Sequence, residues 1–240
     1  MSSAISALYE PLIARDLASV PAAVAEFRQH HSAEELYLAV ARFAVLAYAP
    51  SQHAKHAVLA ALAAHDVRED MGDRWDDLLL ECAYYAASSR QPWSEPPLMT
   101  PPEISDDLPT DADELRAAIA DRDRLRAERW LAAKLDDPSL ERDLIAVAAE
   151  DLSDQGHKLI LTDAALRLVP ILGEKGRFAT LRMAVWELTS YAGDESGTWN
   201  FDAADRLGLL ITECVAEGGS IESAHAVFLL SAAIECRLVK

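Results

Sequence analysis

The sequence contains little glycine, and this shortage favours helices over loop-rich or sheet-rich folds. Glycine makes up 9 of the 240 residues, whereas alanine and leucine are abundant and β-branched residues are few. Alanine and leucine have high intrinsic helix propensity, while β-branched and aromatic residues are the ones enriched in strands. A hydrophobic content of 51% with 26% charged residues excludes wholesale disorder. The composition therefore favours a globular, mainly helical chain that is long enough to bury a sizeable core.

Cysteine is also scarce, and its spacing excludes the usual disulfide and metal frameworks. The three cysteines (Cys82, Cys214 and Cys236) are far apart, and no two of them form a Cys-x-x-Cys pair. Each falls within a helical pattern, which is typical of a small buried side chain in a reducing compartment. No apolar run approaches the roughly 18 residues that a transmembrane helix needs, and no signal-peptide pattern follows Met1. We expect a cytoplasmic protein without a membrane segment.

Basic residues are outnumbered by acidic ones, which excludes one large class of partners. Lysine and arginine total 22 against 40 aspartates and glutamates, giving a formal net charge of −18 at pH 7. Such a surface repels nucleic-acid phosphates and anionic lipids, and it attracts a basic partner. We therefore expect no nucleic-acid binding. Glycine-rich phosphate loops and Gly-x-Ser-x-Gly elbows are also missing, so no motif names a reaction or a cofactor.

Apolar residues recur at helical spacing along almost the whole chain. No segment shows the period-two alternation of a strand. Capping signals support several helix starts: Ser32 with Glu35 has the form of a capping box, Thr110 resembles an N-cap, and Pro138 suits a first helical position. The pattern predicts an all-α fold of about eleven helices, at residues 4–18, 21–29, 33–48, 52–65, 74–88, 111–133, 138–152, 157–172, 177–191, 202–217 and 220–238.

A proline-rich stretch divides the chain. Residues 89–110 hold six prolines and little periodicity, and each proline fixes its own φ and restricts the residue before it. This stretch is the clearest linker in the sequence. We predict a first helical half at 1–105, which includes most of the linker, and a second half with the C-terminal helix at 106–240.

The two halves resemble each other in sequence. Four pairs match at an offset of 106 residues: Glu35 with Glu141, Glu81 with Glu187, Tyr85 with Tyr191 and Trp93 with Trp199. In the middle helix the offset is 104, and it matches His53 with His157. Self-similarity of helical units is typical of stacked helical hairpins whose apolar faces cover one another. We predict an internally duplicated, pseudo-twofold helical bundle.

Histidines at the starts of helices are the main candidate site residues. The positive end of a helix dipole disfavours an imidazolium, so such a histidine stays neutral and able to accept a proton or coordinate a metal. If the halves face each other, His53 and His157 converge on one interior site. The candidate ligand-binding residues are His157, His53, His56, His225, Asp163 and Trp199. In the alternative interpretation each histidine bonds the carbonyl end of the preceding helix, and Trp199 plugs the bundle.

One stretch of the second half resembles a known family. It comprises the run Gln155-Gly156-His157-Lys158-Leu159-Ile160-Leu161-Thr162, then Ala165-Leu166, and Trp199 downstream. These residues are similar to a helical family of bacteria whose members occur alone or attached to a Rieske-type iron–sulfur domain, and which is distantly questin-oxidase-like. The resemblance implies an oxidative role on a small hydrophobic molecule, with His157 facing the site. Asp163 stands where an amide residue is expected, and the chain has no Rieske ligands, so any redox centre would come from elsewhere.

Two hypotheses about function remain open at this point. In the first, a site between the two halves binds a small hydrophobic molecule or a metal in an oxidative, for example biosynthetic, pathway. In the second, the chain is a non-enzymatic helical scaffold that holds a protein partner through its acidic surface. The sequence does not identify the substrate, the metal, the cofactor or the oligomeric state.

Overall fold

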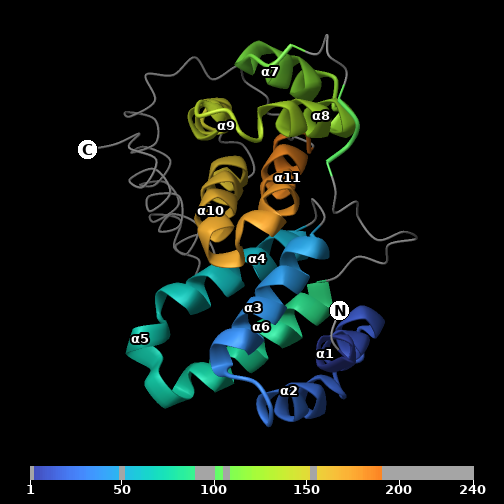
Figure 1. Ribbon diagram of the computed structural model, residues 1–240, viewed down its shortest axis with the longest axis vertical. Coiled ribbons are helices and arrows are strands. Elements are labelled where there is room, and N and C mark those ends of the chain that lie inside the picture. The colour runs from blue at the N-terminus through green and yellow to red at the C-terminus, as the bar shows by residue number, and fades with distance from the viewer. Residues whose placement is uncertain (1–2, 49–51, 90–100, 105–108, 152–155, 191–240) are drawn as a thin grey trace, which may run out of the picture. The chain divides into compact units, whose positions relative to one another are not determined.

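The computed structural model contains helices and turns, and no strand, over the residues that it describes: 3–48, 52–89, 101–104, 109–151 and 156–190 (Figure 1). The predicted all-α class is therefore confirmed for this part of the chain. The predicted helices 202–217 and 220–238 lie outside the described residues, so the count of eleven helices stays a prediction. No helix among the described residues is long and apolar enough to cross a membrane.

The chain divides into two compact units. The first comprises Met1–Met99 and Leu168–Thr180, and the second comprises Thr100–Arg167 and Leu181–Lys240. The first unit thus includes residues 168–180, which are far from the rest of it in the sequence, and the predicted boundary at 105/106 stays a prediction.

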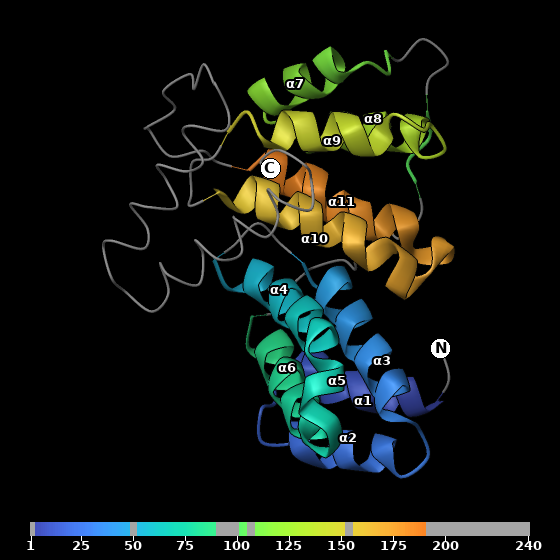
Figure 2. The ribbon, with the colours of Figure 1, turned by 90° about the vertical axis from the view of Figure 1, so that its left-hand side faces the viewer.

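The first unit is built around three helices, α3 (Ala33–Leu46), α4 (Gln52–Asp66) and α6 (Trp75–Ser89), which lie side by side in both views (Figures 1 and 2). The connecting and flanking elements are α1 (Ser3–Ala14), α2 (Val20–Arg28), the short α5 (Arg68–Met71) and the 3₁₀ turn η1 (Gly72–Arg74). Helices α1 and α2 both contact α6. Apolar faces of these amphipathic helices therefore meet around α6.

The predicted capping box at the start of α3 is confirmed. The Ser32 hydroxyl accepts a hydrogen bond from the Glu35 backbone N–H at 3.2 Å, and the Ser32 backbone N–H donates to the Glu35 carboxylate at 2.8 Å. The backbone bond from Ser32 is the main reason that the pKa of Glu35 is lowered. Two N–H groups that have no partner within the helix are thus satisfied.

Tyr37 is buried in the first unit, and its hydroxyl has no hydrogen-bond partner among the residues that the structure describes. The ring centroid lies 5.4 Å from that of His65 and 5.8 Å from that of Trp75, and burial is the main cause that raises the pKa of the phenol. An unsatisfied buried hydroxyl destabilises the folded state. We expect Tyr37→Phe to raise the free energy of unfolding by about 1 kcal/mol, as measured by urea denaturation.

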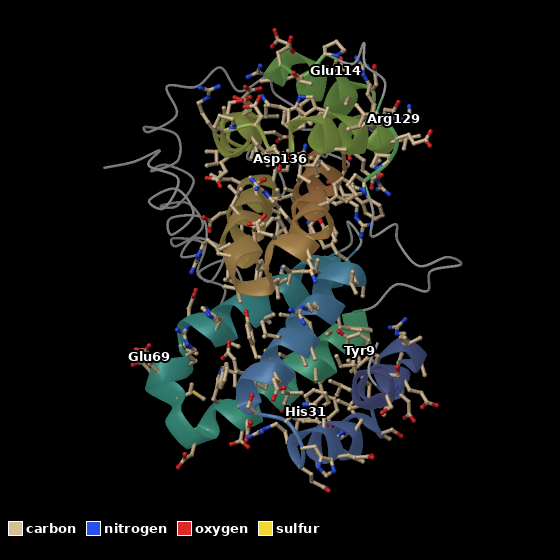
Figure 3. All side chains as sticks on the ribbon, viewed as in Figure 1. Tyr9, His31, Glu69, Glu114, Arg129 and Asp136 are labelled. Carbon is tan, nitrogen blue, oxygen red and sulfur yellow. The ribbon has the colours of Figure 1, made fainter. Side chains whose placement is uncertain are left out.

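Tyr9 provides the matched control for this measurement (labelled in Figure 3). Its hydroxyl is also buried, but it donates to the Ala39 carbonyl at 2.8 Å. Desolvation by burial raises the pKa of Tyr9 to about 12. We expect Tyr9→Phe to lower stability by about 1 kcal/mol, because this bond is lost. A Tyr37→Phe variant that loses as much stability as Tyr9→Phe would contradict the prediction.

The second unit contains helices α7 (Ala112–Ala120), α8 (Arg124–Lys134) and α9 (Leu140–Ala148), together with most of α10 (His157–Leu172) and α11 (Arg177–Leu188). The last two helices form an antiparallel hairpin joined by the 3₁₀ turn η3 (Glu174–Gly176). The predicted spans of these two helices agree with the structure to within three residues.

The prediction of one continuous helix over 111–133 is wrong. The chain reverses between α7 and α8, where Arg122 has a φ of 55° and the Asp123 side chain accepts the Arg126 N–H at 3.0 Å. The Asp123 N–H donates to the Ala118 carbonyl at 2.9 Å, which closes a Schellman-type turn without glycine. An arginine in this left-handed conformation is uncommon, and the charge pattern of the segment gives no signal of it.

Two predicted helix starts in this unit also need correction. The N-cap of α7 is Asp111, whose carboxylate accepts the Glu114 N–H at 3.0 Å, and not Thr110. Helix α9 follows Ser139, so Pro138 precedes the helix rather than occupying its first position. The Asp137 carboxylate accepts the Ser139 N–H at 2.7 Å, and this local turn delays the start of the helix.

Ion pairs with little solvent exposure hold the helices of the second unit together. The side chains of Lys134 and Asp143 are 5% and 11% exposed and bond to each other between α8 and α9. The Arg126 guanidinium bonds the Glu114 carboxylate at 2.5 Å and 2.8 Å, which joins α8 to α7 (Glu114 is labelled in Figure 3). Because each pair links two helices, these contacts fix the α7–α8–α9 arrangement.

Candidate functional site

A pocket of about 610 Å³ lies in the first unit, along the groove between α4 and α6. Its lining residues are Leu17, Ala60, Ala63, Ala64, Val67, Leu78, Glu81, Cys82, Tyr84, Tyr85 and Ser88. Those on the two helices recur mostly at three- and four-residue spacing, so each helix presents one face to the pocket. The α4 face carries only alanines within the helix, and these small side chains leave the space that larger residues would fill.

The edges of this α4–α6 pocket are apolar and exposed. Leu17, which follows α1, is 41% exposed, and Val67, which follows α4, is 38% exposed. Scattered apolar residues on a surface are ordinary, but these two border the same pocket, so its rim is apolar like its lining.

The polar groups of the pocket come from α6. The Glu81 carboxylate and the hydroxyls of Tyr84, Tyr85 and Ser88 all belong to lining residues. Tyr85 is half-buried, and this burial raises the pKa of its phenol. No lysine, arginine or histidine is found among the lining residues in the described part of the chain. The pocket therefore offers one negative charge and several hydroxyls to a ligand, but no positive charge.

Cys82 lines the pocket as a neutral thiol. Burial, reinforced by the nearby Glu81 carboxylate, raises its pKa to about 11. The thiol donates to the Ala60 carbonyl at a sulfur–oxygen distance of 3.6 Å. Because the thiolate is the nucleophilic form, this cysteine is unreactive at neutral pH. It contributes apolar surface to the pocket rather than covalent chemistry.

The structure places the predicted histidines in different units. His157 begins α10 in the second unit and is 3% exposed, while His56 is a half-buried residue of α4 in the first unit. His225 and Trp199 lie outside the described residues, as does the side chain of His53. The convergence of these histidines on one site therefore stays a prediction. Within the described residues, no group of three or more His, Cys, Asp and Glu side chains is arranged to hold a metal.

Lys158, Thr162 and Asp163, which follow His157 along α10, are polar and buried. The next residue, Lys158, bonds the Asp151 carboxylate at 2.6 Å, and the Thr162 hydroxyl donates to the Lys158 carbonyl at 2.8 Å. Asp163, a predicted site residue, is buried and lies 3.8 Å from the Arg167 guanidinium. The two charged residues among them thus form ion pairs, Lys158 with Asp151 before α10 and Asp163 with Arg167 along α10.

The α4–α6 pocket was not predicted from the sequence. The one available signal was the alanine spacing on the helix predicted at 52–65, with small residues at positions 60, 63 and 64 opposite the aromatic pair at 84 and 85. Alanine stripes also occur in ordinary helix packing, so this signal alone does not separate a pocket from a core contact. Comparison of the chain with family models, with curated protein sequences and with solved structures gives no match.

Proposed function

We propose that this protein binds a small, mainly apolar molecule, neutral or cationic, in the α4–α6 pocket. The observation that carries the proposal is a pocket of about 610 Å³ with an apolar lining and one set of polar groups on α6. Ligand pockets typically enclose about 300–1,000 Å³ and combine apolar walls with a few polar groups that orient the ligand. The proposal keeps the small hydrophobic ligand that was predicted from the sequence. It places the site within the first unit, whereas the sequence-based hypothesis placed it between the two halves.

The charge of the lining selects the ligand class. A ligand carboxylate or phosphate would lie near the Glu81 carboxylate, and no lining residue is a cation that offsets the repulsion. The Arg15 guanidinium, at the Ser88 end of the pocket, already donates to the Ser88 carbonyl at 2.8 Å. A hydroxyl or ammonium group would instead donate to Glu81, and the Tyr84 and Tyr85 rings favour a cation at their faces. The net charge of −18 adds a long-range attraction for cations. Neutral and cationic ligands are therefore preferred over anions.

The decisive experiment measures binding of Nile red, a neutral apolar dye, by fluorescence. Phenylalanine at position 63 would occupy the pocket, because Ala63 lines it from α4. We expect Ala63→Phe to weaken dye binding by about tenfold or more, equivalent to at least about 1.4 kcal/mol. Ala25→Phe is the matched control, since Ala25 is an exposed residue of α2 in the same unit and does not line the pocket.

Competition with ligands of equal chain length tests the charge preference. Octylamine and octanol should displace the dye, octanoate should not, and Glu81→Gln should remove the advantage of the amine over the alcohol. Equal dye affinity in the Ala63→Phe and Ala25→Phe variants would show that the dye binds elsewhere, and it would overturn the proposal. If only a peptide helix and no small molecule competed with the dye, the groove would be a protein-binding site, as in the alternative hypothesis.

The turns of the two halves support the proposed internal duplication. Among the described residues, the non-glycine residues with positive φ are Arg15 (59°), after α1, and Arg122 (55°), after α7. Each is followed by an aspartate whose N–H donates 2.9 Å to a carbonyl five residues back, at Pro11 and Ala118 respectively. A strained conformation recurring at equivalent helix ends is more specific than an apolar pattern.

The α4–α6 and α10–α11 connections share a second feature, a glycine of positive φ at the start of a 3₁₀ turn. Gly72 opens the 3₁₀ turn η1 before α6 with a φ of 52°, and Gly173 precedes the 3₁₀ turn η3 before α11 with a φ of 86°. Only glycine adopts such φ values without strain. On this proposal the two halves descend from one helical unit, and the binding pocket belongs to the first.

A further inference from the structure

A second pocket of about 340 Å³ lies in the first unit, between α3 and the segment 168–180 that belongs to this unit. Its lining residues are Arg42, Val45, Leu46, Leu172, Lys175, Gly176, Ala179 and Thr180. The aliphatic side chains form an apolar floor, and Arg42 and Lys175 supply two positive charges at exposed positions. No carboxylate is found among the lining residues in the described part of the chain. This charge pattern is the reverse of that in the α4–α6 pocket.

Within the described part of the chain, the two cations of this pocket form no ion pair with a carboxylate. Several cations bond carboxylates: Arg28 with Asp76 at 2.8 Å, Arg116 with Asp113 at 2.7 Å, Arg126 with Glu114 at 2.5 Å and Lys158 with Asp151 at 2.6 Å. Neither Arg42 nor Lys175 forms such a pair with any described residue. Other exposed cations among the described residues, such as Arg74 and Arg129, form no such pair either, so Arg42 and Lys175 are distinguished by lining one pocket whose lining has no carboxylate. An anionic ligand would supply the negatively charged partner for both cations.

The geometry of Arg42 leaves most of its donors available. One guanidinium N–H donates to the Leu172 carbonyl at 3.3 Å, which fixes the side chain beside the end of α10. A guanidinium has five N–H donors in a planar fork, and this fork matches a carboxylate. The positive end of α11 lies beside the pocket at Gly176, and it favours an anion further.

The nearest acidic residue on the segment does not occupy the pocket. Glu174 is 75% exposed at its side chain, and its carboxylate lies 3.5 Å from the Arg177 guanidinium. It is not a lining residue. The carboxylate is therefore held by another cation and leaves Arg42 and Lys175 to an external ligand.

We propose that this α3–hairpin pocket binds a small organic carboxylate. The carboxylate lies between Arg42 and Lys175, and the apolar body of the ligand covers Val45, Leu46 and Ala179. The site differs from the α4–α6 pocket in lining residues and in the sign of its charge, so the proposal goes beyond the proposed function. A chain with both pockets takes a cationic or neutral ligand at one and an anionic ligand at the other.

The test compares octanoate with octanol, which share a chain length and differ in the head group. Isothermal titration of the full-length protein carrying Ala63→Phe, which fills the α4–α6 pocket, should show octanoate binding about tenfold or more tighter than octanol, because charged hydrogen bonds are the stronger ones. Arg42→Gln combined with Lys175→Gln should remove this tenfold preference. The preference should also fall when the salt concentration rises from 0.05 to 0.5 M, because the pocket charges are exposed.

Arg74→Gln combined with Arg129→Gln is the matched control, because it removes the same charge from exposed residues outside the pocket (Arg129 is labelled in Figure 3). The control should keep the full octanoate preference. Two results would overturn the proposal. In the first, both double variants lose the octanoate preference equally. In the second, octanoate binding disappears in Ala63→Phe but survives Arg42→Gln combined with Lys175→Gln. Inorganic phosphate that binds as tightly as octanoate would also overturn it, since the apolar floor would then contribute nothing. The Nile red measurement reads the other pocket, so the two proposals fail independently.

Discussion

Replacing Lys134 by methionine is expected to lower the free energy of unfolding of the second unit by about 3–5 kcal/mol. The Lys134 ammonium, 5% exposed, bonds the Asp143 carboxylate and the Ser139 hydroxyl. Methionine has a similar length but no charge, so the variant leaves Asp143 buried without its main counter-ion. Breaking a buried pair on one side costs far more than the pair contributes, because the remaining charge stays desolvated.

Arg142 provides a control on the same carboxylate. Its guanidinium also bonds Asp143, at 3.0 Å, but its side chain is 77% exposed. We expect Arg142→Met to cost less than about 1 kcal/mol. Lys134→Met combined with Asp143→Leu should recover most of the lost stability, because an apolar pair of similar volume replaces both charges. A single variant Lys134→Met that costs no more than Arg142→Met would show that the pair is not desolvated.

The pH dependence of this pair has a definite sign. Burial raises the pKa of Asp143, but hydrogen bonds from Lys134, Arg142 and Ser139 outweigh it, so the pKa is lowered from its ordinary 3.8. The pair therefore stabilises the fold above that value, and this stability is lost as the pH falls through the lowered pKa. Lys134→Met removes one of the hydrogen bonds that lower the pKa of Asp143, while burial still raises it. The pKa of Asp143 is therefore higher in the variant than in the wild type. The stability difference between wild type and variant should shrink as the pH falls from 7 towards 4.

Replacing Trp130 by alanine is the second change with a large expected effect, about 3–5 kcal/mol. Trp130 is 0% exposed and is the largest fully buried side chain of the described residues. Its indole N–H donates to the Asp111 carbonyl at 2.7 Å, which ties α8 to the residue that caps α7. Alanine would leave a large cavity and remove this bond, and the surrounding helices relax only partly.

Trp130→Phe separates the cost of the cavity from the cost of the lost hydrogen bond. Phenylalanine keeps most of the apolar area and loses the N–H donor, so we expect a cost of about 1–3 kcal/mol. Hydrogen exchange measured by mass spectrometry on peptides of α7 and α8 reports this unit directly, which avoids a two-state assumption for a chain of two units. Equal protection of α7 in the wild type and in Trp130→Ala would contradict the proposed role of this side chain.

Most helices of the first unit could be predicted because their signals are local, but α1 ends at Ala14 and not at the predicted residue 18, since Arg15 has a φ of 59°, and the short α5 was not predicted. Ser32 and Glu35 are three residues apart, and the bonds between them depend on no other part of the chain. The break between α7 and α8 was missed because its signal is weak. Arg122 takes a conformation that sequence reasoning assigns to glycine or asparagine, and the surrounding charged residues are all compatible with one long helix.

The candidate sites were harder to predict because they depend on packing between segments. The pairing of Lys134 with Asp143 joins residues on two helices, and neither residue has a neighbour in the sequence that marks it as buried. Arg42 meets the Leu172 carbonyl 130 positions away. The histidines drew attention because histidine has distinctive chemistry, whereas the α4–α6 pocket is marked mainly by alanines, which are common throughout this chain.

Neither unit of this protein is one continuous stretch of chain. Residues 168–180 group with Met1–Met99, so the polypeptide passes from one unit to the other three times. A truncation at the proline-rich segment 89–110 would therefore not isolate the first unit, because it would discard Leu172, Lys175 and Ala179 from the α3–hairpin pocket. Dissection of this chain into fragments must follow the spatial grouping, for example by joining 1–99 to 168–180 through a designed linker.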